Sequence, residues 1–242
     1  MNLQNQTILV VGGATGIGQA TAQLCAERGA TVIVADFNAD AGAATAQTIG
    51  GTFMPVDVTD EGSIQGLSDQ INQRYGKLDG LIQTAGILKG AYLSIEEFES
   101  ALFRQVLDVN TVGSFLCAKY AVPLLKQGQQ PVIILISSPA AYGVSSSYAY
   151  AVSKGGVSAL GTTMAGKLAP EGIRVNVVFP GGINTEMKRS VIEADAVRQG
   201  QDPQAALAAQ SGGLGDPAGV AKVLAWLVSD EAAYVRGAIH TR

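Results

Sequence analysis

Short apolar runs alternate with longer segments of helical periodicity along almost the whole chain. The longer segments predict helices over 17–28, 39–48, 61–75, 98–125, 148–168 and 217–227. Asp60 directly precedes the third of these helices and is a favourable N-cap residue. The apolar runs are rich in β-branched residues and predict seven strands, at 7–11, 31–35, 52–56, 78–83, 132–137, 173–179 and, with the least pronounced pattern, 235–240.

Most of the predicted strands are apolar at nearly every position and do not alternate with polar residues. Such strands require a sheet that is covered on both faces, and their alternation with helices indicates parallel pairing. We therefore predict an α/β fold, a doubly wound parallel sheet of about seven strands with helices on both faces (Rossmann fold). Because no interior segment has the composition of a linker and no repeat occurs, residues 1–242 are interpreted as a single domain.

One long segment, 186–216, shows no clear pattern and is rich in Gly, Gln and Ala. Irregular segments of this length in compact domains are usually functional lids or disordered. We expect a flexible lid here.

Composition narrows the classes of partner. The chain has a formal net charge of −4 and only 15% charged residues, so it lacks the basic surface that binds nucleic acid or anionic membranes. Its apolar runs fall short of the ~20 residues of a membrane span, and residues 1–6 lack the basic start of a signal peptide, which favours a cytoplasmic protein. Cys25 and Cys117 lie in apolar helical patterns and His240 is the one histidine, so we expect no metal site.

A glycine-rich turn joins the first predicted strand to the first helix. It reads Gly12-Gly13-Ala14-Thr15-Gly16-Ile17-Gly18. Glycines allow the backbone to approach a pyrophosphate, and the helix N-terminus adds free N–H groups and a partial positive charge. In this strand–turn–helix context the turn indicates a dinucleotide site.

The second predicted strand is followed by Asp36, about 20 residues beyond the turn, where a carboxylate can accept hydrogen bonds from an adenosine ribose. A 2′-phosphate would be repelled by this carboxylate, and neither Thr15 nor Phe37 offers a compensating positive charge. We predict NAD(H) over NADP(H).

Tyr150 and Lys154 are four residues apart in the predicted helix 148–168 and therefore share one face. A nearby ammonium stabilises phenolate and lowers the pKa of a tyrosine, so such a pair can move protons. By itself this spacing is common on helix surfaces. Its context is more specific, because Ser137 and Ser138 end a strand, and strand ends in a doubly wound sheet line the ligand crevice.

These features together resemble the short-chain dehydrogenase/reductase family in its single-domain branch. The resemblance extends over almost the whole chain and rests on five motifs: the glycine turn, Asp57-Val58 after the third strand, Asn110, Ser138 with Tyr150-Ala-Val-Ser-Lys154, and Pro180-Gly181-Gly182-Ile183-Asn184-Thr185. It implies an oxidoreductase that transfers a hydride between NAD(H) and an alcohol or ketone.

The resemblance also implies a role for each matching residue. Tyr150 would be the general acid for reduction and the general base for oxidation, and Ser138 would hold the substrate oxygen. Lys154 would bind the nicotinamide ribose and lower the tyrosine pKa, and Asn110 would hold a water in the proton relay. Asp57 and Val58 would contact the adenine, and Ile183 and Thr185 the carboxamide. The full set expected at the cofactor is Gly12, Thr15, Gly16, Ile17, Gly18, Asp36, Phe37, Asp57, Val58, Ala85, Gly86, Tyr150, Lys154, Pro180, Gly181, Ile183 and Thr185.

Ser137 competes with Ser138, because the loop to Tyr150 is about one residue shorter than the commonest form in the family. Side chains alternate along a strand, so only one of the two serines faces the crevice, and we choose Ser138 from the predicted strand end. Asn110 could instead satisfy backbone groups at an irregularity in its helix, and Asp57 could merely terminate a strand.

Two departures from the family pattern affect the central strands. Val11 stands where a threonine often precedes the glycine turn, so a hydrogen bond between the turn and a neighbouring strand is expected to be missing. Gln83-Thr84-Ala85-Gly86 replaces the usual Asn-Asn-Ala-Gly.

Three alternative functions remain open: a catalytically idle NAD-binding protein, a nucleotide-sugar epimerase or dehydratase of the longer branch, and a 3-oxoacyl carrier-protein reductase. Retention of all four catalytic residues disfavours the first, and 242 residues leave little room for the second. Many enzymes resembling the third prefer NADP(H), against the interpretation of Asp36.

The predicted substrate pocket is largely apolar, which favours a moderately apolar alcohol or ketone. It would be lined by Leu88, Ala140, Tyr142, Val144 and the lid. Amphipathic faces on 98–125 and 148–168 agree with the family's habit of pairing subunits there, so we expect a homodimer or homotetramer.

Overall fold

A computed structural model describes residues 1–143 and 145–241 and contains the predicted parallel sheet. Its strands are β1 (Thr7–Val11), β2 (Thr31–Asp36), β3 (Thr52–Pro55), β4 (Gly80–Gln83), β5 (Val132–Ile136), β6 (Arg174–Phe179) and β7 (Gly237–His240). The order across the sheet is β3-β2-β1-β4-β5-β6-β7, and every pairing is parallel. The predicted fold class is confirmed, and the strand bounds agree with the predictions to within two residues.

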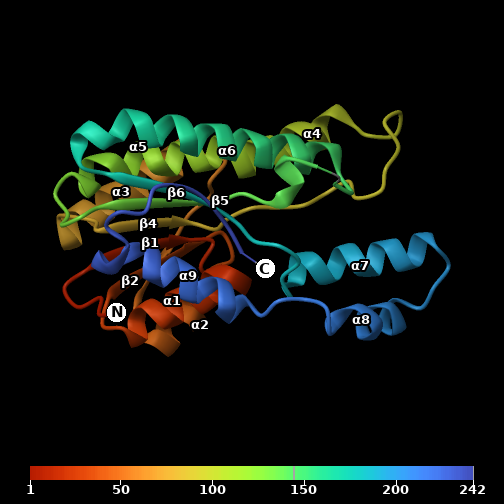
Figure 1. Ribbon diagram of the computed structural model, residues 1–242, viewed down its shortest axis with the longest axis horizontal. Coiled ribbons are helices and arrows are strands. Elements are labelled where there is room, and N and C mark those ends of the chain that lie inside the picture. Colours follow the sequence, from red (N-terminus) through yellow and green to blue (C-terminus); the bar gives the residue numbers. More distant parts are fainter. Residues whose placement is uncertain (144, 242) are drawn as a thin grey trace.

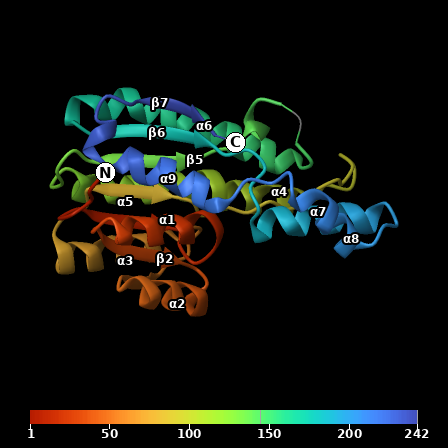
Figure 2. The same cartoon turned by 60° about the horizontal axis from the view of Figure 1, so that its bottom comes forward.

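Helices cover both faces of this sheet, as Figures 1 and 2 show. On one face lie α1 (Gly16–Glu27), α2 (Ala39–Ile49) and α9 (Pro217–Val228). On the other lie α3 (Glu61–Tyr75), α5 (Gly113–Leu125) and α6 (Tyr148–Leu168). The four central strands are buried along their whole length, because each face packs against apolar helix side chains. Asp60 caps α3 as predicted, its carboxylate accepting from the Gly62 N–H.

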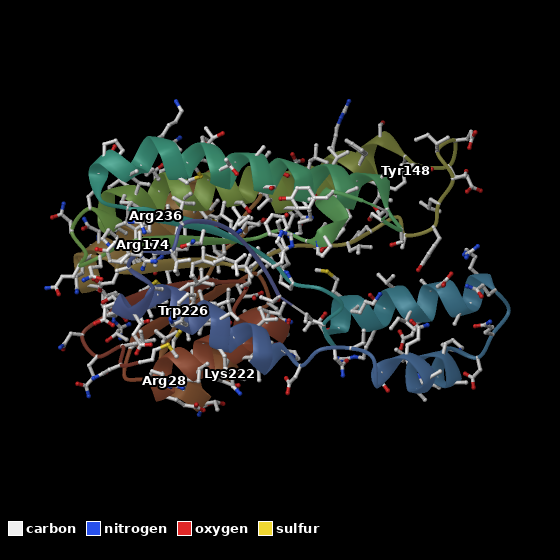
Figure 3. All side chains as sticks on the ribbon, in the orientation of Figure 1. Arg28, Tyr148, Arg174, Lys222, Trp226 and Arg236 are labelled. Carbon is white, nitrogen blue, oxygen red and sulfur yellow. The ribbon has the colours of Figure 1, made fainter. Side chains whose placement is uncertain are left out.

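A buried arginine fixes the end of α9 against β6. Arg174 donates to the carbonyls of Leu227, at 2.9 Å, and Ala232, at 3.2 Å, which lie at and just beyond the helix C-terminus. A cation at this end complements the helix dipole. Burial, and the nearby charge of Arg236, lower the Arg174 pKa to about 10; Figure 3 shows the two arginines near each other.

The predicted helix over 98–125 is helical from Ser100 to Leu125 but is not α-helical throughout. It is divided into α4 (Ser100–Leu107), a five-residue π-helical segment (Asp108–Val112) and α5. A π-helical turn widens the helix by one residue and often marks a functional position. Here it contains Asn110.

The prediction of an irregular segment at 186–216 is also wrong. It contains α7 (Glu186–Arg198) and α8 (Pro203–Ser211), which project together beyond the sheet in Figures 1 and 2. Thr185 caps α7 by accepting from the Lys188 N–H, and Asp202 caps α8 ahead of Pro203. These capping residues favour helix over the glycines, which lie only between and after the helices.

Single 3-10 turns occur at Pro139–Ala141, Ala169–Glu171 and Asp230–Ala232. Within the described ranges, no helix is long and apolar enough to cross a membrane. The described residues also contain no group of three or more His, Cys, Asp or Glu placed to hold a metal ion.

Candidate active site

All seven strands are parallel, so their carboxyl ends meet at one edge of the sheet, where the structure has a cavity of about 970 Å³. Every residue expected at the cofactor lines it, as does Ser138. Asn110 does not line it but lies fully buried next to it. Segments far apart in the sequence therefore form one site at the topological switch point of the sheet, the usual ligand position in this architecture.

The glycine turn forms the tightest part of the wall. Gly12 has φ +81°, and a Cβ there would lie 2.4 Å from the Ala85 nitrogen. A Cβ on Gly18 would lie 2.0 Å from the Gly12 carbonyl oxygen. Only glycine allows the turn, α1 and the end of β4 to approach this closely.

Thr84 supplies the side-chain bond that Val11 cannot make. Its hydroxyl donates to the Val11 carbonyl at 2.7 Å and lies 3.1 Å from the Gly12 carbonyl. The expectation of a missing bond at the turn is therefore wrong, because a threonine directly after β4 bonds the turn to the neighbouring strand. The Gln83 amide, by contrast, is buried without a hydrogen-bond partner among the described residues.

The N-terminus of α1 faces this cavity, with Gly16, Ile17 and Gly18 in its wall. The side chain of the N-cap residue Thr15 makes no capping bond and the first turn holds no acidic residue, so the first N–H groups and the positive end of the helix dipole are available to an anion. The turn thus fits the pyrophosphate of a dinucleotide.

Asp36 lies at the end of β2 with both carboxylate oxygens oriented by the backbone. One accepts from the Ala14 N–H and the other from the Asn38 N–H, each at 2.9 Å. Phe37 beside it is exposed, and the described residues lining the cavity include no arginine. Such an oriented carboxylate fits ribose hydroxyls.

Asp57 and Val58 line the wall beyond β3. The Asp57 carboxylate bonds within its own turn, to the backbone N–H and hydroxyl of Thr59, so it also ends the strand locally. Opposite α1, Thr185 lies close to Gly16, where a Cβ would be 3.3 Å from the threonine methyl group.

Tyr150 lies in the first turn of α6 and lines the cavity. Ser147 caps this helix by accepting from the Tyr150 N–H. The Tyr150 phenol lies beside the Ser138 side chain, and both line the cavity. Burial raises the pKa of Tyr150, and the neighbouring Ser138 hydroxyl lowers it by less. The expected lowering by Lys154 is not found, because burial lowers the lysine pKa and raises the tyrosine pKa, so the lysine loses its charge before the phenol ionises.

The two serines at the end of β5 have different environments. Ser137 is buried, and its hydroxyl donates to the Lys154 carbonyl at 2.8 Å. Ser138 lies beside the Tyr150 phenol, and its hydroxyl accepts from the Ala140 N–H at 3.2 Å. The geometry therefore pairs Ser138, and not Ser137, with the phenol.

Lys154 is almost completely buried, and its ammonium donates to the Ile136 carbonyl at 2.8 Å. It lies 5.6 Å from the centre of the Tyr150 ring. Burial lowers the Lys154 pKa to about 8.

Asn110 joins the segment after β4 to α6. Its amide oxygen accepts from the Ile87 N–H at 2.7 Å, and its amide nitrogen donates to the Ile87 carbonyl and the Ser153 hydroxyl, each at 2.9 Å. Ser153 in turn donates to the Tyr150 carbonyl at 2.9 Å. The side chain thus bonds a different segment, and not an irregularity in its own helix.

The substrate end differs from the predicted pocket. Leu88 and Ala140 line the cavity, whereas the Tyr142 ring stacks on Phe179 outside the lining, with centroids 5.1 Å apart. Val144 lies outside the described residues. Met187 and Lys188 of the expected lid also line the cavity, whereas sequence reasoning missed Lys89 and Tyr92, which line it as well. It also missed Ser147, although a serine preceding a helical pattern is a recognisable N-cap signal.

The comparisons with known proteins agree with this geometry. Residues 12–241 match the family model described as "Enoyl-(Acyl carrier protein) reductase". Tropinone reductase-like 2 of Erythroxylum coca is 36% identical over 241 residues, 97% of this chain and 88% of that protein.

The chain belongs to the short-chain dehydrogenase/reductase family. Another member, 3-oxoacyl-[acyl-carrier-protein] reductase FabG of Thermotoga maritima, is 35% identical over 99% of this chain and 96% of its own length. The crystal structure of levodione reductase matches with a TM-score of 0.89 and 26% identity over 99% of this chain and 96% of that one. As a short-chain dehydrogenase/reductase, the protein is an oxidoreductase of a family that binds nicotinamide cofactors and small-molecule substrates.

Proposed function

We propose that this protein transfers a hydride between NAD(H) and a small alcohol or ketone, with Tyr150 as the general acid or base. The observation that supports this most directly is the position of the Tyr150 phenol beside Ser138 in the cavity wall, one helical turn from a buried lysine. Bound nicotinamide supplies or accepts the hydride.

The residues around the phenol perform the proton transfer and the positioning. Ser138 orients the substrate oxygen toward Tyr150, which donates its proton during reduction and removes one during oxidation. A phenol with a raised pKa is protonated at neutral pH, the form that reduction requires. Lys154 holds the nicotinamide ribose, and Asn110 positions Ile87 and, through Ser153, the first turn of α6. The Asn110 side chain can bind a relay water only through the second lone pair of its amide oxygen, because both amide N–H groups already donate to protein atoms.

The remaining lining residues form the binding site for the dinucleotide. Gly12, Gly16 and Gly18 would admit the pyrophosphate, Asp36 would bind the adenosine ribose, and Asp57 and Val58 would contact the adenine. Pro180, Gly181, Ile183 and Thr185 would position the nicotinamide beside Ala85 and Gly86. The oriented, negatively charged Asp36 supports NAD(H) over NADP(H).

A coupled assay tests the proposal. Purified protein is offered a panel of alcohols and ketones with NAD(H) and with NADP(H), and nicotinamide absorbance is followed, with Tyr150→Phe as the control. We expect turnover with NAD(H) that the variant lacks. Dinucleotide binding without turnover of any substrate would support an idle binding protein.

A second candidate is a reductase of carrier-protein-bound 3-oxoacyl groups. The similarity to FabG supports it. A 3-oxoacyl carrier-protein thioester in the same panel decides between them: faster turnover of the thioester than of every free ketone would favour this candidate.

We also propose that 186–216 acts as a substrate lid and that the protein forms a homodimer or homotetramer. Met187, Lys188 and Val191 of α7 line the cavity, which supports the lid.

Exposed apolar residues gather on the π-helical segment, α5 and α6, which supports subunit pairing there. They are Val112, Phe115, Tyr148 and Val152.

A further inference from the structure

The segment that follows β4 forms one wall of the substrate end of the cavity. Leu88, Lys89 and Tyr92 all line it. Two hydrogen bonds to the backbone of this segment hold the wall in place. The Lys89 carbonyl accepts from the Ser147 hydroxyl at 2.7 Å, and the Tyr92 N–H donates to the Ser146 carbonyl at 2.6 Å. The backbone that carries Lys89 is therefore fixed to the start of α6.

The same serine connects Lys89 to the proposed acid. Ser147 donates to the Lys89 carbonyl, and its oxygen accepts from the Tyr150 N–H at 3.3 Å. Lys89 and Tyr150 thus belong to neighbouring parts of one hydrogen-bonded frame, and both face the cavity. A small molecule whose oxygen meets Tyr150 can extend to the Lys89 side chain, which has four methylenes of reach.

The Lys89 side chain is exposed at the cavity wall. Within the described residues, its ammonium makes no ion pair and no hydrogen bond, and the Arg198 guanidinium that lies 5.0 Å from the centre of the neighbouring Tyr92 ring is itself paired with Asp195. Of the acidic residues in the cavity wall, Asp36 ends β2 and Asp57 follows β3, both at the nucleotide end, and Glu186 lies on α7 together with Lys188. A recess with an unpaired cation favours an anionic ligand group.

We propose that Lys89 is a specificity-determining residue that binds a carboxylate of the substrate, so that the substrate class is oxo acids and the corresponding hydroxy acids. This inference rests on the proposed function. The reacting oxygen lies at Tyr150 and Ser138, the apolar body of the substrate packs on Leu88 and Met187, and the carboxylate lies at Lys89. It replaces the preference for uncharged substrates that the apolar sequence pattern suggested.

Matched pairs of ketones test the inference. Each pair consists of an oxo acid and its methyl ester, with the ketone two, three or four carbons from the carboxyl, and 4-oxocyclohexanecarboxylate and its ester add a cyclic pair. We expect the wild-type protein to prefer the acid in at least one pair. Lys89→Met should then raise KM for the acid about tenfold, the scale of a hydrogen bond between charged groups, and leave KM for the ester unchanged.

Two further variants separate charge from structure. Lys89→Arg keeps the cation and should retain the preference for the acid. Lys167→Met removes an exposed lysine from the last turn of α6, away from the cavity, and should behave as wild type.

The possible failures are distinguishable. If uncharged ketones are turned over but no acid is preferred, or if Lys89→Met affects acid and ester equally, the anion site is overturned and the oxidoreductase proposal stands. If neither acids, esters nor other ketones are turned over, the proposed function fails, and the inference fails with it.

Discussion

At the glycine turn the cavity wall is formed mainly by glycine backbone, whereas around Tyr150 it consists of partly or fully buried side chains. The nucleotide end depends on close approach, since Cβ atoms on Gly12 or Gly18 would overlap neighbouring backbone. The catalytic end depends on hydrogen bonds, with Ser137, Lys154 and Asn110 each bonded to a backbone carbonyl.

This difference predicts which kind of substitution should impair each end of the cavity. A substitution that adds side-chain volume should impair binding at the nucleotide end, because the closely packed backbone there has no room to move. At the catalytic end, removal of a single polar atom should be sufficient, because each atom either orients the phenol or satisfies a buried group.

The pair of serines at the end of β5 gives the largest expected contrast. Ser138→Ala should lower kcat/KM about 10²- to 10³-fold, as for loss of a donor to a reacting oxygen. Ser137→Ala, which removes the bond to the Lys154 carbonyl, should lower it less than about tenfold and cost about 1 kcal/mol of stability. Steady-state kinetics and urea unfolding of both variants check this. The reverse order of kinetic effects would reassign the catalytic serine.

Lys154 makes stability depend on pH. Its pKa is about 8 in the folded chain against an ordinary value of 10.5, so between these values the unfolded chain binds more protons and stability rises with pH. Relative to Lys154→Met, the wild-type protein should gain about 3 kcal/mol in free energy of unfolding from pH 8 to 10.5. Urea unfolding of both proteins at several pH values measures this. A constant difference would contradict the buried, lowered pKa.

Side-chain volume added at the glycine turn should weaken dinucleotide binding. Gly12→Ala places a Cβ 2.4 Å from the Ala85 nitrogen and should raise Kd about 50-fold, a loss of about 2.3 kcal/mol. Gly50→Ala is a matched control, since Gly50 also has a positive φ, +64°, but no atom lies within 4 Å of the added Cβ. Calorimetric titration of NAD(H) should show normal binding to the control. Equal losses in both variants would attribute the effect to backbone strain alone.

The smallest expected effect concerns the choice of cofactor. The wild-type protein should bind NAD(H) at least about tenfold more tightly than NADP(H), and Asp36→Ala should reduce that ratio to near one. Asp40→Ala removes the same charge from an exposed position on α2 outside the cavity and should preserve the ratio. Tighter binding of NADP(H) to the wild-type protein would refute the assignment.

The sheet, most of the helices and the residues that line the cofactor part of the cavity could be predicted from sequence because local patterns determine them. Buried parallel strands are apolar throughout, and the glycine turn needs its residues at fixed offsets. Ser138 could be preferred over Ser137 from the strand end alone, and the geometry pairs Ser138 with the phenol.

Features that depend on contacts between distant segments could not be predicted. The π-helical turn at Asn110 accompanies a bond to Ile87, 23 residues away, and Thr84 replaces a bond that Val11 lacks. The Tyr150 pKa was expected to fall beside an ammonium, but burial, which the pair's spacing does not reveal, raises it. The sequence pattern did not predict α7 and α8, because the glycines between and after these helices are typical of loops and obscured the N-cap residues.

The most direct test of the central claim is the effect of Tyr150→Phe on kcat at neutral pH, measured with a turned-over ketone and NADH and accompanied by the Kd for NADH. The change deletes the phenolic proton and preserves the ring. We predict that kcat falls about 10²- to 10⁴-fold, the usual contribution of a general acid, while Kd stays unchanged. Undiminished turnover in the variant would contradict Tyr150 as the proton donor and with it the proposed mechanism.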